Sequence, residues 1–465
     1  MTKESIVKTD VAQVEDKKAV KGFFKILGEV ADAVRSWIGN ISPDLSSSRD
    51  IDSLVLKMNE CLNPKGGEVS ARKNTVSLGN LYLSLSEKGK IKFLQTLAEK
   101  FNLNKAEIDE KIKEYRKNQN PELNYKFEQD LVKVLESPRS KILKQFISLP
   151  EGLKFIVDMR SDVLKLKNQY KELNRLESEL KSILFSWVDV DLLDLRQITW
   201  DSPASLLEKL IKYEAVHKIS SWGDLKNRLD SDRLCFAFFH YKIPNEPLIF
   251  VEVALVNKIA DSIQHLLDES VPSSDPSSAS TAIFYSISNT QAGLSGISLG
   301  NFLIKRVVEK LSQEFKSIKT YATLSPIPGF TKWLKEGLSQ DITLLSKLNI
   351  KQSSAEILES IEQLKTNVEC KKQCLLKLCA HYLLKVKNSS GGAYDPVAHF
   401  HLSNGASIKQ LNWMADTSEK GISQSAGMMV NYLYELSKID NNHESYMVNK
   451  VVSHSKQVLS VLKGK

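Results

Sequence analysis

The chain has 465 residues, of which 42% are hydrophobic and 8% aromatic, so it is globular in composition and long enough for two or three domains. Its 64 lysines and arginines exceed its 56 aspartates and glutamates by eight, but basic and acidic residues alternate along the chain. This pattern argues against a dedicated nucleic-acid-binding protein and favours a mild attraction for polyanionic ligands. The longest apolar candidate, PLIFVEVALV, is about half of the ~18 residues that a membrane span requires and contains Glu252, so we expect no membrane partner.

Residues 1–45 are expected to form a tail with one amphipathic segment, GFFKILGEVADAVRSWI. Acidic residues stand near the start, at Glu4 and Asp10, which fits neither a secretory signal nor an arginine-rich, acid-poor transit peptide. The five cysteines form no disulfide framework, which is typical of a reducing compartment. We therefore expect a cytoplasmic protein, with the mitochondrion as the alternative.

Residues 46–200 show a helical pattern throughout. Leu166, Leu173 and Leu180 belong to an apolar stripe with alternating three- and four-residue spacing, in a stretch that ends near Trp187. The region carries no visible chemistry. It is typical of a helical bundle that serves as a scaffold or an oligomer interface.

From residue 201 onward, short β-branched and aromatic runs replace the helical pattern. Four runs have strand character: LCFAFFH (234–240), PLIFVEVAL (247–255), TAIFYSIS (281–288) and TYATLSP (320–326). Between the third and the fourth lies QAGLSGISLGNFLIKRVVEKL (291–311), a glycine-containing loop followed by an amphipathic helix pattern. The order of strand, loop, helix and strand predicts an α/β unit with a right-handed crossover.

The loop places Gln291, Gly293, Gly296 and Gly300 directly before the helix. Free backbone N–H groups and the helix dipole converge at such a position, so a phosphate is the first candidate ligand. The spacing matches neither the Walker loop nor the dinucleotide fingerprint, and glycines that only form turns are the alternative interpretation. In stretched form, the loop resembles the Gln/Arg-x-x-Gly-x-Gly/Ala pyrophosphate loop of the acetyl-CoA-dependent N-acetyltransferase superfamily, where the polyphosphate belongs to coenzyme A.

Longer blocks carry a closer resemblance. From about residue 200 onward the chain is similar, in collinear order, to malonyl-CoA decarboxylases, in the blocks FAFFHYKIPNEPLIFVEVAL, TAIFYSISNTQAGLSGISLGNFLIKRVV, LSPIPGFTKWL and DPVAHFHLSNGASIKQLNWMADTSEKGISQSAGMMVNYLYEL. The resemblance implies an α+β multidomain fold, with an N-terminal all-α helical bundle (46–200) that forms homo-oligomers and an acetyltransferase-like (GNAT-type) α/β catalytic domain (201–465). It also implies conversion of malonyl-CoA to acetyl-CoA and CO2, with no metal or organic cofactor.

The chemistry of malonyl-CoA is consistent with a sequence that lacks metal-ligand clusters and cofactor motifs. Its carboxylate lies β to a thioester carbonyl, so loss of CO2 leaves an enolate delocalised onto the thioester oxygen. The protein has to bind coenzyme A and hold the carboxylate out of the carbonyl plane. It also has to stabilise the enolate oxygen and deliver a proton to C2.

The family's catalytic serine and histidine map onto Ser325 of LSPIPGF and His401 of AHFHLSNGA. Asp395 and Pro396 are typical of the N-cap and first residue of a short helix that ends near Asn404, which puts His401 in its last turns. His399 invites a metal interpretation together with His401. Neighbours two apart on a helix, however, point about 200° apart and cannot chelate one ion, whereas on a strand they could. The resemblance also implies three substrate-binding residues: Ser286, Tyr434 and Asn404.

The resemblance places coenzyme A on the loop residues Gln291, Gly293, Gly296, Ser298 and Gly300. The chain departs from the family pattern at Ser298, where some members carry a glutamate within GVELG. An acid at that position therefore cannot be essential here, unless Ser298 relays a proton through water.

Two other functions remain open on the sequence. A CoA-dependent acyltransferase shares the expected fold but would need an acceptor site with a base. A non-catalytic, CoA-sensing protein is favoured by the large helical half, although the presence of both Ser325 and His401 speaks against it. Formation of acetyl-CoA and CO2 without any acceptor discriminates among the three.

Overall fold

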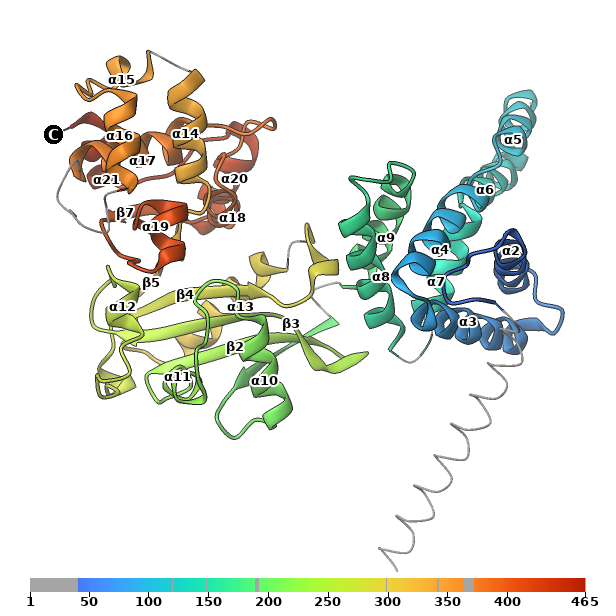
Figure 1. Ribbon diagram of the computed structural model, residues 1–465, viewed down its shortest axis with the longest axis horizontal. Coiled ribbons are helices and arrows are strands. Elements are labelled where there is room, and N and C mark those ends of the chain that lie inside the picture. The colour runs from blue at the N-terminus through green and yellow to red at the C-terminus, as the bar shows by residue number, and fades with distance from the viewer. Residues whose placement is uncertain are drawn as a thin grey trace, which may run out of the picture. The chain divides into compact units, whose positions relative to one another are not determined.

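The computed structural model describes residues 41–118, 120–147, 149, 151–188, 192–297, 299–340, 343–362 and 372–464. They fall into two units, a helical unit that ends at Val188 but also contains Gln291–Ser295, and an α/β unit made of the remaining described residues (Figure 1). The sequence placed this division at residue 200. Because Leu193–Ile198 form a strand of the sheet, the structure places it at Val188. Most of the expected tail lies outside the described residues.

The helical unit is built from helices that bury one face each, except for the pair α5 and α6, which bury none of their residues. Its core contains Leu54, Phe93, Phe146 and Leu180, all fully buried. The apolar stripe that the sequence showed as one stretch is divided between α8 and α9. The helices are α2 (Ser48–Leu62), α3 (Gly67–Ser84), α4 (Glu87–Lys100), α5 (Lys105–Lys117), α6 (Asn124–Leu135), α7 (Pro138–Ile147), α8 (Gly152–Leu166) and α9 (Leu173–Trp187).

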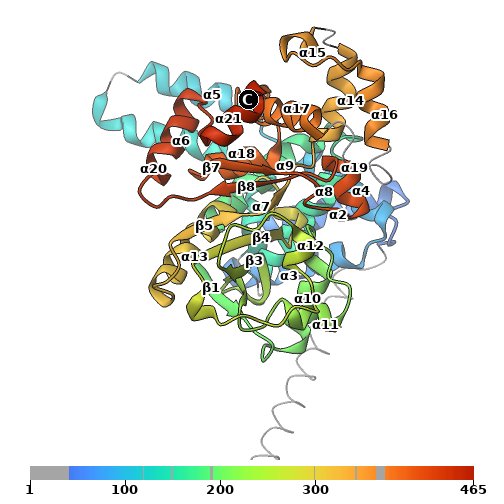
Figure 2. The same ribbon diagram turned by 90° about the vertical axis from the view of Figure 1, so that its left-hand side faces the viewer.

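The α/β unit contains one mixed sheet in the order β1-β2-β3-β4-β5-β8-β6, with β7 paired to β8. All neighbours are antiparallel except β4 and β5, which are parallel and joined through helix α13 (Gly300–Glu314). Figure 2 shows β7 and β8 on one side of β5 and β3 on the other. The strands are β1 (Leu193–Ile198), β2 (Arg233–His240), β3 (Ile243–Val256), β4 (Thr281–Asn289), β5 (Thr320–Thr323), β6 (Ser325–Pro326), β7 (Ser407–Asn412) and β8 (Met429–Leu433).

Helices pack against the sheet, and most of them belong to the C-terminal part of the chain, after β6. Apolar residues of α10 and α11 form one core cluster with Cys235, Ala237 and Phe250 of β2 and β3. The helices drawn in orange and red cluster together beside the sheet (Figure 1). The helices of the unit other than α13 are α10 (Ala204–Tyr213), α11 (Trp222–Asn227), α12 (Ile263–Leu266), α14 (Phe330–Gln340), α15 (Leu344–Lys347), α16 (Ser354–Glu362), α17 (Lys372–Lys385), α18 (Pro396–Ser403), α19 (Glu419–Ser425), α20 (Ile439–Asn449) and α21 (Lys456–Lys463).

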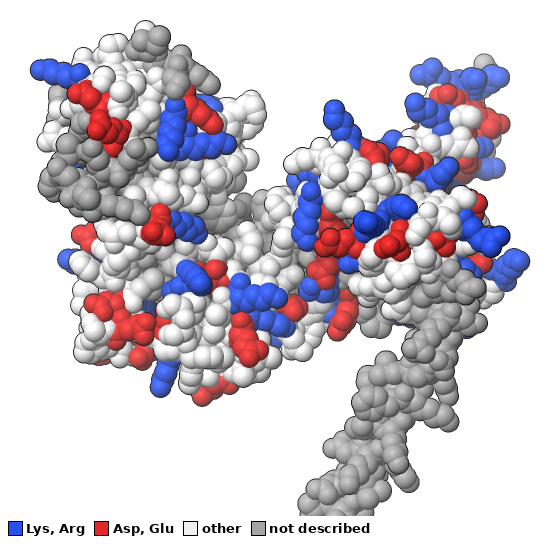
Figure 3. Space-filling view, in the orientation of Figure 1, with Lys and Arg blue, Asp and Glu red and all other residues white. Residues whose placement is uncertain are grey.

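The fold class expected from the sequence is confirmed in its architecture: a helical N-terminal unit is followed by an α/β unit built on one mixed sheet. All four runs of strand character form strands, and the run at 320–326 is divided into β5 and β6 at Leu324. Lysines and arginines are interspersed with acidic residues over the face drawn in Figure 3, as the alternating sequence pattern indicates. Among the described residues, no helix is long and apolar enough to span a membrane.

Candidate active site

The sheet opens where β4 and β5 part. The two strands pair only as far as Phe284 and Thr323, after which the chain turns away into β6 and pairs with β8 instead. On the other side of β4, Glu252 pairs with Ser286 and Val253 with Phe284, so Tyr285 is an extra residue in a β-bulge. A bulge bends its strand and re-aims the neighbouring side chains. Bulge and strand exchange together leave a gap between β4 and β6.

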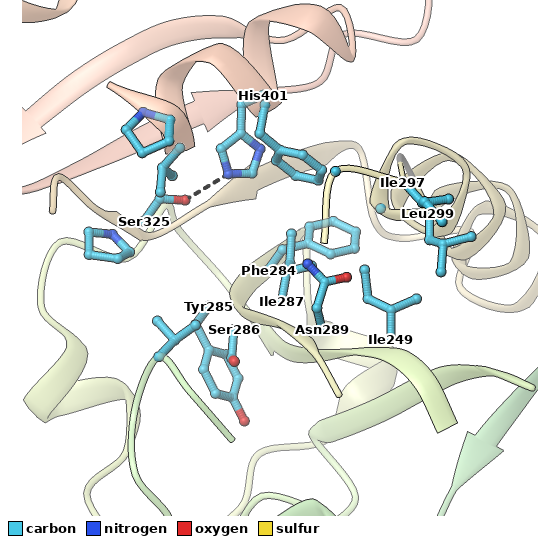
Figure 4. Close-up of a pocket in the computed structure, with 17 residues that line it drawn as sticks. Ile249, Phe284, Tyr285, Ser286, Ile287, Asn289, Ile297, Leu299, Ser325 and His401 are labelled. Atoms are coloured by element: carbon cyan, nitrogen blue, oxygen red, sulfur yellow. Dashed lines mark hydrogen bonds between the residues drawn. The ribbon is translucent and has the colours of Figure 1, made fainter. Parts of the chain in front are cut away.

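A cavity of about 350 Å³ occupies this gap. This volume is in the range of small-molecule sites, and the mixture of apolar walls with a few polar groups is typical of them. Figure 4 shows Ser325 and His401 close together and Ser286 set apart from them. The lining residues include Ser286 and Asn289 of β4, Gly296 and Gly300 of the loop, Ser325 and Pro326 of β6, and Phe400 and His401 of α18.

Ser325 and His401, the two residues predicted to be catalytic, meet in the cavity wall. Ser325 Oγ lies 3.1 Å from Nε2 of His401 and donates a hydrogen bond to Thr323 Oγ1 at 2.8 Å. His401 Nδ1 lies 2.8 Å from the hydroxyl of Tyr434. Ser325 is 6% exposed and His401 is 2% exposed, although both line the cavity. The predicted substrate-binding residue Tyr434 thus contacts the histidine.

These contacts fix the direction of one hydrogen-bonded chain. Since the single proton of Ser325 is donated to Thr323, the contact with His401 requires a proton on Nε2. A neutral ring then accepts at Nδ1, where the hydroxyl of Tyr434 donates. Burial lowers the pKa of His401 to about 3 and raises that of Tyr434, so both groups are neutral at neutral pH. The chain runs from Tyr434 through His401 and Ser325 to Thr323.

Helix α18 presents His401 to the cavity and begins as the sequence predicts. Asp395 is its N-cap, and one carboxylate oxygen accepts from the N–H groups of Val397 and Ala398 at 2.9 Å each. The other oxygen accepts from Gly329 N–H and from the hydroxyl of Tyr382, both at 3.3 Å. Gly329 follows Ser325 by four residues, so one buried carboxylate connects the helix of the histidine to the segment of the serine. Burial raises the pKa of Asp395.

The remaining predicted substrate residues have different surroundings. Ser286 lines the cavity and donates to the buried carboxylate of Glu214, with both oxygens at 2.8 Å. Asn404 is the C-cap of α18, and its side-chain amide donates to the carbonyl of Phe400 at 2.6 Å. It is absent from the cavity lining described above.

His399 lies on α18 but contacts Tyr446 through Nδ1 at 2.7 Å, whereas His401 contacts Tyr434. The two histidines therefore have separate partners, as the helical spacing predicts. Within the described parts of the chain, no group of three or more His, Cys, Asp and Glu side chains is arranged to hold a metal ion.

The first part of the loop, Gln291–Ser295, packs with the helical unit. Buried Arg160 of α8 donates to the carbonyls of Gly293 at 2.6 Å and Ser295 at 2.9 Å. A Cβ at Gly293 would overlap the carbonyl oxygen of Val157. Close approach to α8 therefore accounts for this glycine without a ligand, and the assignment of Gln291 and Gly293 to coenzyme A stays a prediction.

The second part of the loop reaches the cavity. Gly296 has a φ of 73°, a conformation that favours glycine, and lines the cavity together with Gly300. A Cβ at Gly300 would come within 2.6 Å of the ring of Phe400, so this glycine lets α13 approach α18. Ser298 lies outside the described residues.

Sequence reasoning missed two polar partners of the site. Thr323 could have been found, because residues two apart on a strand share a face and Thr323 precedes Ser325 by two. Glu214 gives no such signal. It is 72 positions before Ser286 in the chain and meets it only through the fold.

Comparisons with known proteins identify the family of the chain. The malonyl-CoA decarboxylase C-terminal domain model matches residues 191–465, and the corresponding N-terminal domain model matches residues 101–188. Mitochondrial malonyl-CoA decarboxylase of Anser anser anser is 39% identical over 381 residues, covering 76% of this chain and 75% of the relative. The mouse enzyme is 38% identical over 351 residues, covering 70% and 71%.

Solved structures are similar over a larger share of the chain. Malonyl-CoA decarboxylase from Rhodopseudomonas palustris matches with a TM-score of 0.78 and 37% identity over 89% of this chain and 99% of that one. The Agrobacterium vitis enzyme matches with a TM-score of 0.79 and 35% identity over 90% and 100%. The chain therefore belongs to the malonyl-CoA decarboxylase family and is an enzyme of the carboxy-lyase class.

Proposed function

We propose that the chain converts malonyl-CoA to acetyl-CoA and CO2 at the cavity between β4 and β6, with no metal or organic cofactor. The observation that carries this proposal is the hydrogen-bonded chain of Tyr434, His401 and Ser325 in the cavity wall, within the region that the family model matches. Malonyl-CoA would enter with its thioester between the parted strands. Its phosphates would lie toward the loop before α13, where backbone N–H groups and a helix N-terminus favour anions.

The apolar part of the cavity supports the first step. Ile249, Phe284 and Ile287 line it, and such walls solvate a carboxylate poorly. The charge that leaves the carboxylate as CO2 departs moves onto the thioester oxygen, where hydrogen-bond donors stabilise it. With substrate bound, the Ser325 hydroxyl would turn its proton from Thr323 Oγ1 to the thioester oxygen, while His401 Nε2–H continues to donate to Ser325.

The same residues complete the reaction by protonating C2. Ser325 gives its proton to the enolate carbon and takes one from Nε2 of His401, while Nδ1 takes the hydroxyl proton of Tyr434. Because burial raises the pKa of Tyr434, a phenolate formed in this way would readily regain a proton from water. The atoms balance, since one proton enters for each CO2 released.

The test measures CO2 and acetyl-CoA formation from malonyl-CoA by purified protein, with a chelator present and without any acyl acceptor. We expect product at enzymic rates, and a loss of about 10²-fold or more in kcat for Ser325→Ala and for His401→Gln with little change in coenzyme A affinity. His399→Gln is the matched control, because it changes a histidine of the same helix that faces Tyr446. Coenzyme A binding without product would favour a transferase or a sensor.

Two further expectations remain predictions. The compartment is one: the relatives described above include mitochondrial enzymes and bacterial ones. Homo-oligomer formation through the helical unit is the other. It is supported by α6, which leaves Tyr125 71% and Val132 62% exposed.

A further inference from the structure

A group of buried polar residues lies beside the cavity, apart from the Ser325 chain. Glu214, directly after α10, is only 8% exposed. Its carboxylate accepts from the hydroxyls of Ser286 at 2.8 Å and Ser288 at 3.1 Å. It also accepts from the backbone N–H groups of Val216 and His217, both at 2.8 Å. An ionised carboxylate only accepts hydrogen bonds and has room for about four, so these four donors fit an ionised Glu214.

This arrangement determines which way the hydroxyl of Ser286 points. A serine has a single proton, and both oxygens of Glu214 lie within 2.8 Å of Ser286 Oγ, so the proton is donated to Glu214. Only lone pairs of Ser286 remain for the cavity. Ser286 is therefore a hydrogen-bond acceptor there, backed by a negative charge.

A second buried acid lies next to this wall and shows how costly another negative charge is there. Glu252 pairs with Ser286 in the sheet register and contacts Arg228 at 3.0 Å, while Arg228 also pairs with Asp224. Burial and the neighbouring Glu214 raise the pKa of Glu252 to about 8, despite the arginine. A further negative charge is thus costly near Glu214, and the same holds for a substrate carboxylate.

We propose that Glu214 is a positioning residue that keeps Ser286 an acceptor for the amide N–H next to the thioester of an acyl-CoA. This inference rests on the proposed function, since it takes an acyl-CoA as the ligand. The malonyl carboxylate is then directed away from Ser286, and the thioester oxygen faces Ser325 and His401, which lie apart from Ser286 in Figure 4. Donors at one end and an acceptor at the other orient the substrate.

The test compares two ligands in a binding assay that needs no turnover. One is acetyl-CoA, and the other is its analogue in which the amide N–H next to the thioester is replaced by an ester oxygen. The quantity to compare is the Kd of the ester divided by the Kd of acetyl-CoA, both measured by calorimetry. This ratio should be at least ~10 for the wild type and close to one for Ser286→Ala. Ser288→Ala is the matched control, because Ser288 shares Glu214 but does not line the cavity; it should keep the wild-type ratio.

The role of Glu214 is tested with Glu214→Gln. The new amide can donate to Ser286, which turns the serine proton toward the cavity, so the ratio should fall toward one. A purely structural role would weaken both ligands equally and leave the ratio unchanged. In the Ser286→Ala background, Glu214→Gln should leave the ratio where Ser286→Ala alone puts it.

Ser286→Ala decides the matter even where the glutamine variant does not fold. A wild-type ratio in Ser286→Ala, or failure of the wild type to bind acetyl-CoA, overturns the inference. Absence of CO2 release would instead defeat the proposed function, while the ratio still decides the role of Ser286.

Discussion

At the scale of single residues, the protonation state of His401 decides how a proton would move in the proposed mechanism. The ring stacks on Tyr432 with centroids 4.4 Å apart, and burial lowers its pKa to about 3. A neutral imidazole can donate from Nε2 and accept at Nδ1 in the same step, whereas an imidazolium would have no acceptor for Tyr434. In the proposed mechanism the histidine therefore both donates a proton from Nε2 and accepts one at Nδ1.

We predict that His401 stays neutral, with its proton on Nε2, from pH 8 down to pH 5. Nitrogen-15 NMR of histidine-labelled protein reports both the charge and the tautomer. The spectrum of His401→Gln identifies the signal by its loss. A titration midpoint of His401 above pH 5, or a proton on Nδ1, would contradict the direction of the hydrogen-bonded chain.

The lowered pKa of His401 should also make the free energy of unfolding depend on pH. A histidine in the unfolded chain has a pKa near ~6.5, while the folded value of His401 is about 3. Between these values the unfolded state binds a proton that the folded state excludes, so this contribution to stability is present above pH 6.5 and is lost as the pH falls toward 3. Urea unfolding at pH 7 and pH 5 should therefore show a smaller loss for His401→Gln than for the wild type.

At the scale of elements, Asp395 holds two segments together. Asp395→Asn keeps an oxygen for capping α18, but it places an amide donor against the donors Gly329 N–H and Tyr382 O–H. We expect a loss of about 1–2 kcal/mol in unfolding free energy and roughly a tenfold drop in kcat, because His401 and Ser325 lose a common anchor. Tyr382→Phe removes only one of these donors, so it should lower both the unfolding free energy and kcat by less than Asp395→Asn does. An unchanged kcat in Asp395→Asn would show that the cap alone matters.

Helices and strands were predictable where their residues have a strong intrinsic propensity for that structure. The β-branched and aromatic runs of β2, β3 and β4 alternate with turn residues, so their place was clear. Strand β1, LDLRQI, was missed because its middle is largely exposed and charged. The pair Ser325 and His401, which the structure brings together, was predicted from long collinear blocks. The contact of Glu214 with Ser286 could not be predicted, because the two residues are 72 positions apart in the chain and Ser286 lies beside a β-bulge that the sequence does not reveal.

At the scale of the whole molecule, the chain passes between its two units more than once. It leaves the helical unit at Val188, returns to it for Gln291–Ser295, and continues from Gly296 in the α/β unit. Ser295 is bonded directly to Gly296, which lines the cavity. The helical unit therefore holds the start of the loop that we propose for coenzyme A.

Arg160 contributes two hydrogen bonds to this contact. It is 2% exposed, contacts Glu177 at 2.7 Å and donates to the carbonyls of Gly293 and Ser295. A lysine keeps the charge but cannot serve the carboxylate and both carbonyls at once. For Arg160→Lys we predict a loss of about 1.5–3 kcal/mol in unfolding free energy and faster hydrogen exchange at the amides of Leu294 and Ser295.

Arg139→Lys is the matched control for this prediction. Arg139 is equally buried in the same unit, pairs with Glu179 at 2.8 Å and donates to the carbonyl of Ala98, but makes no such contact with the loop. Both variants should lose similar stability, because each disrupts a buried ion pair. Only Arg160→Lys should speed exchange in the loop and weaken acetyl-CoA binding. Equal effects of the two variants on acetyl-CoA would mean that the hold on Gly293 and Ser295 does not reach the ligand, and that the helical unit affects binding only through its general stability.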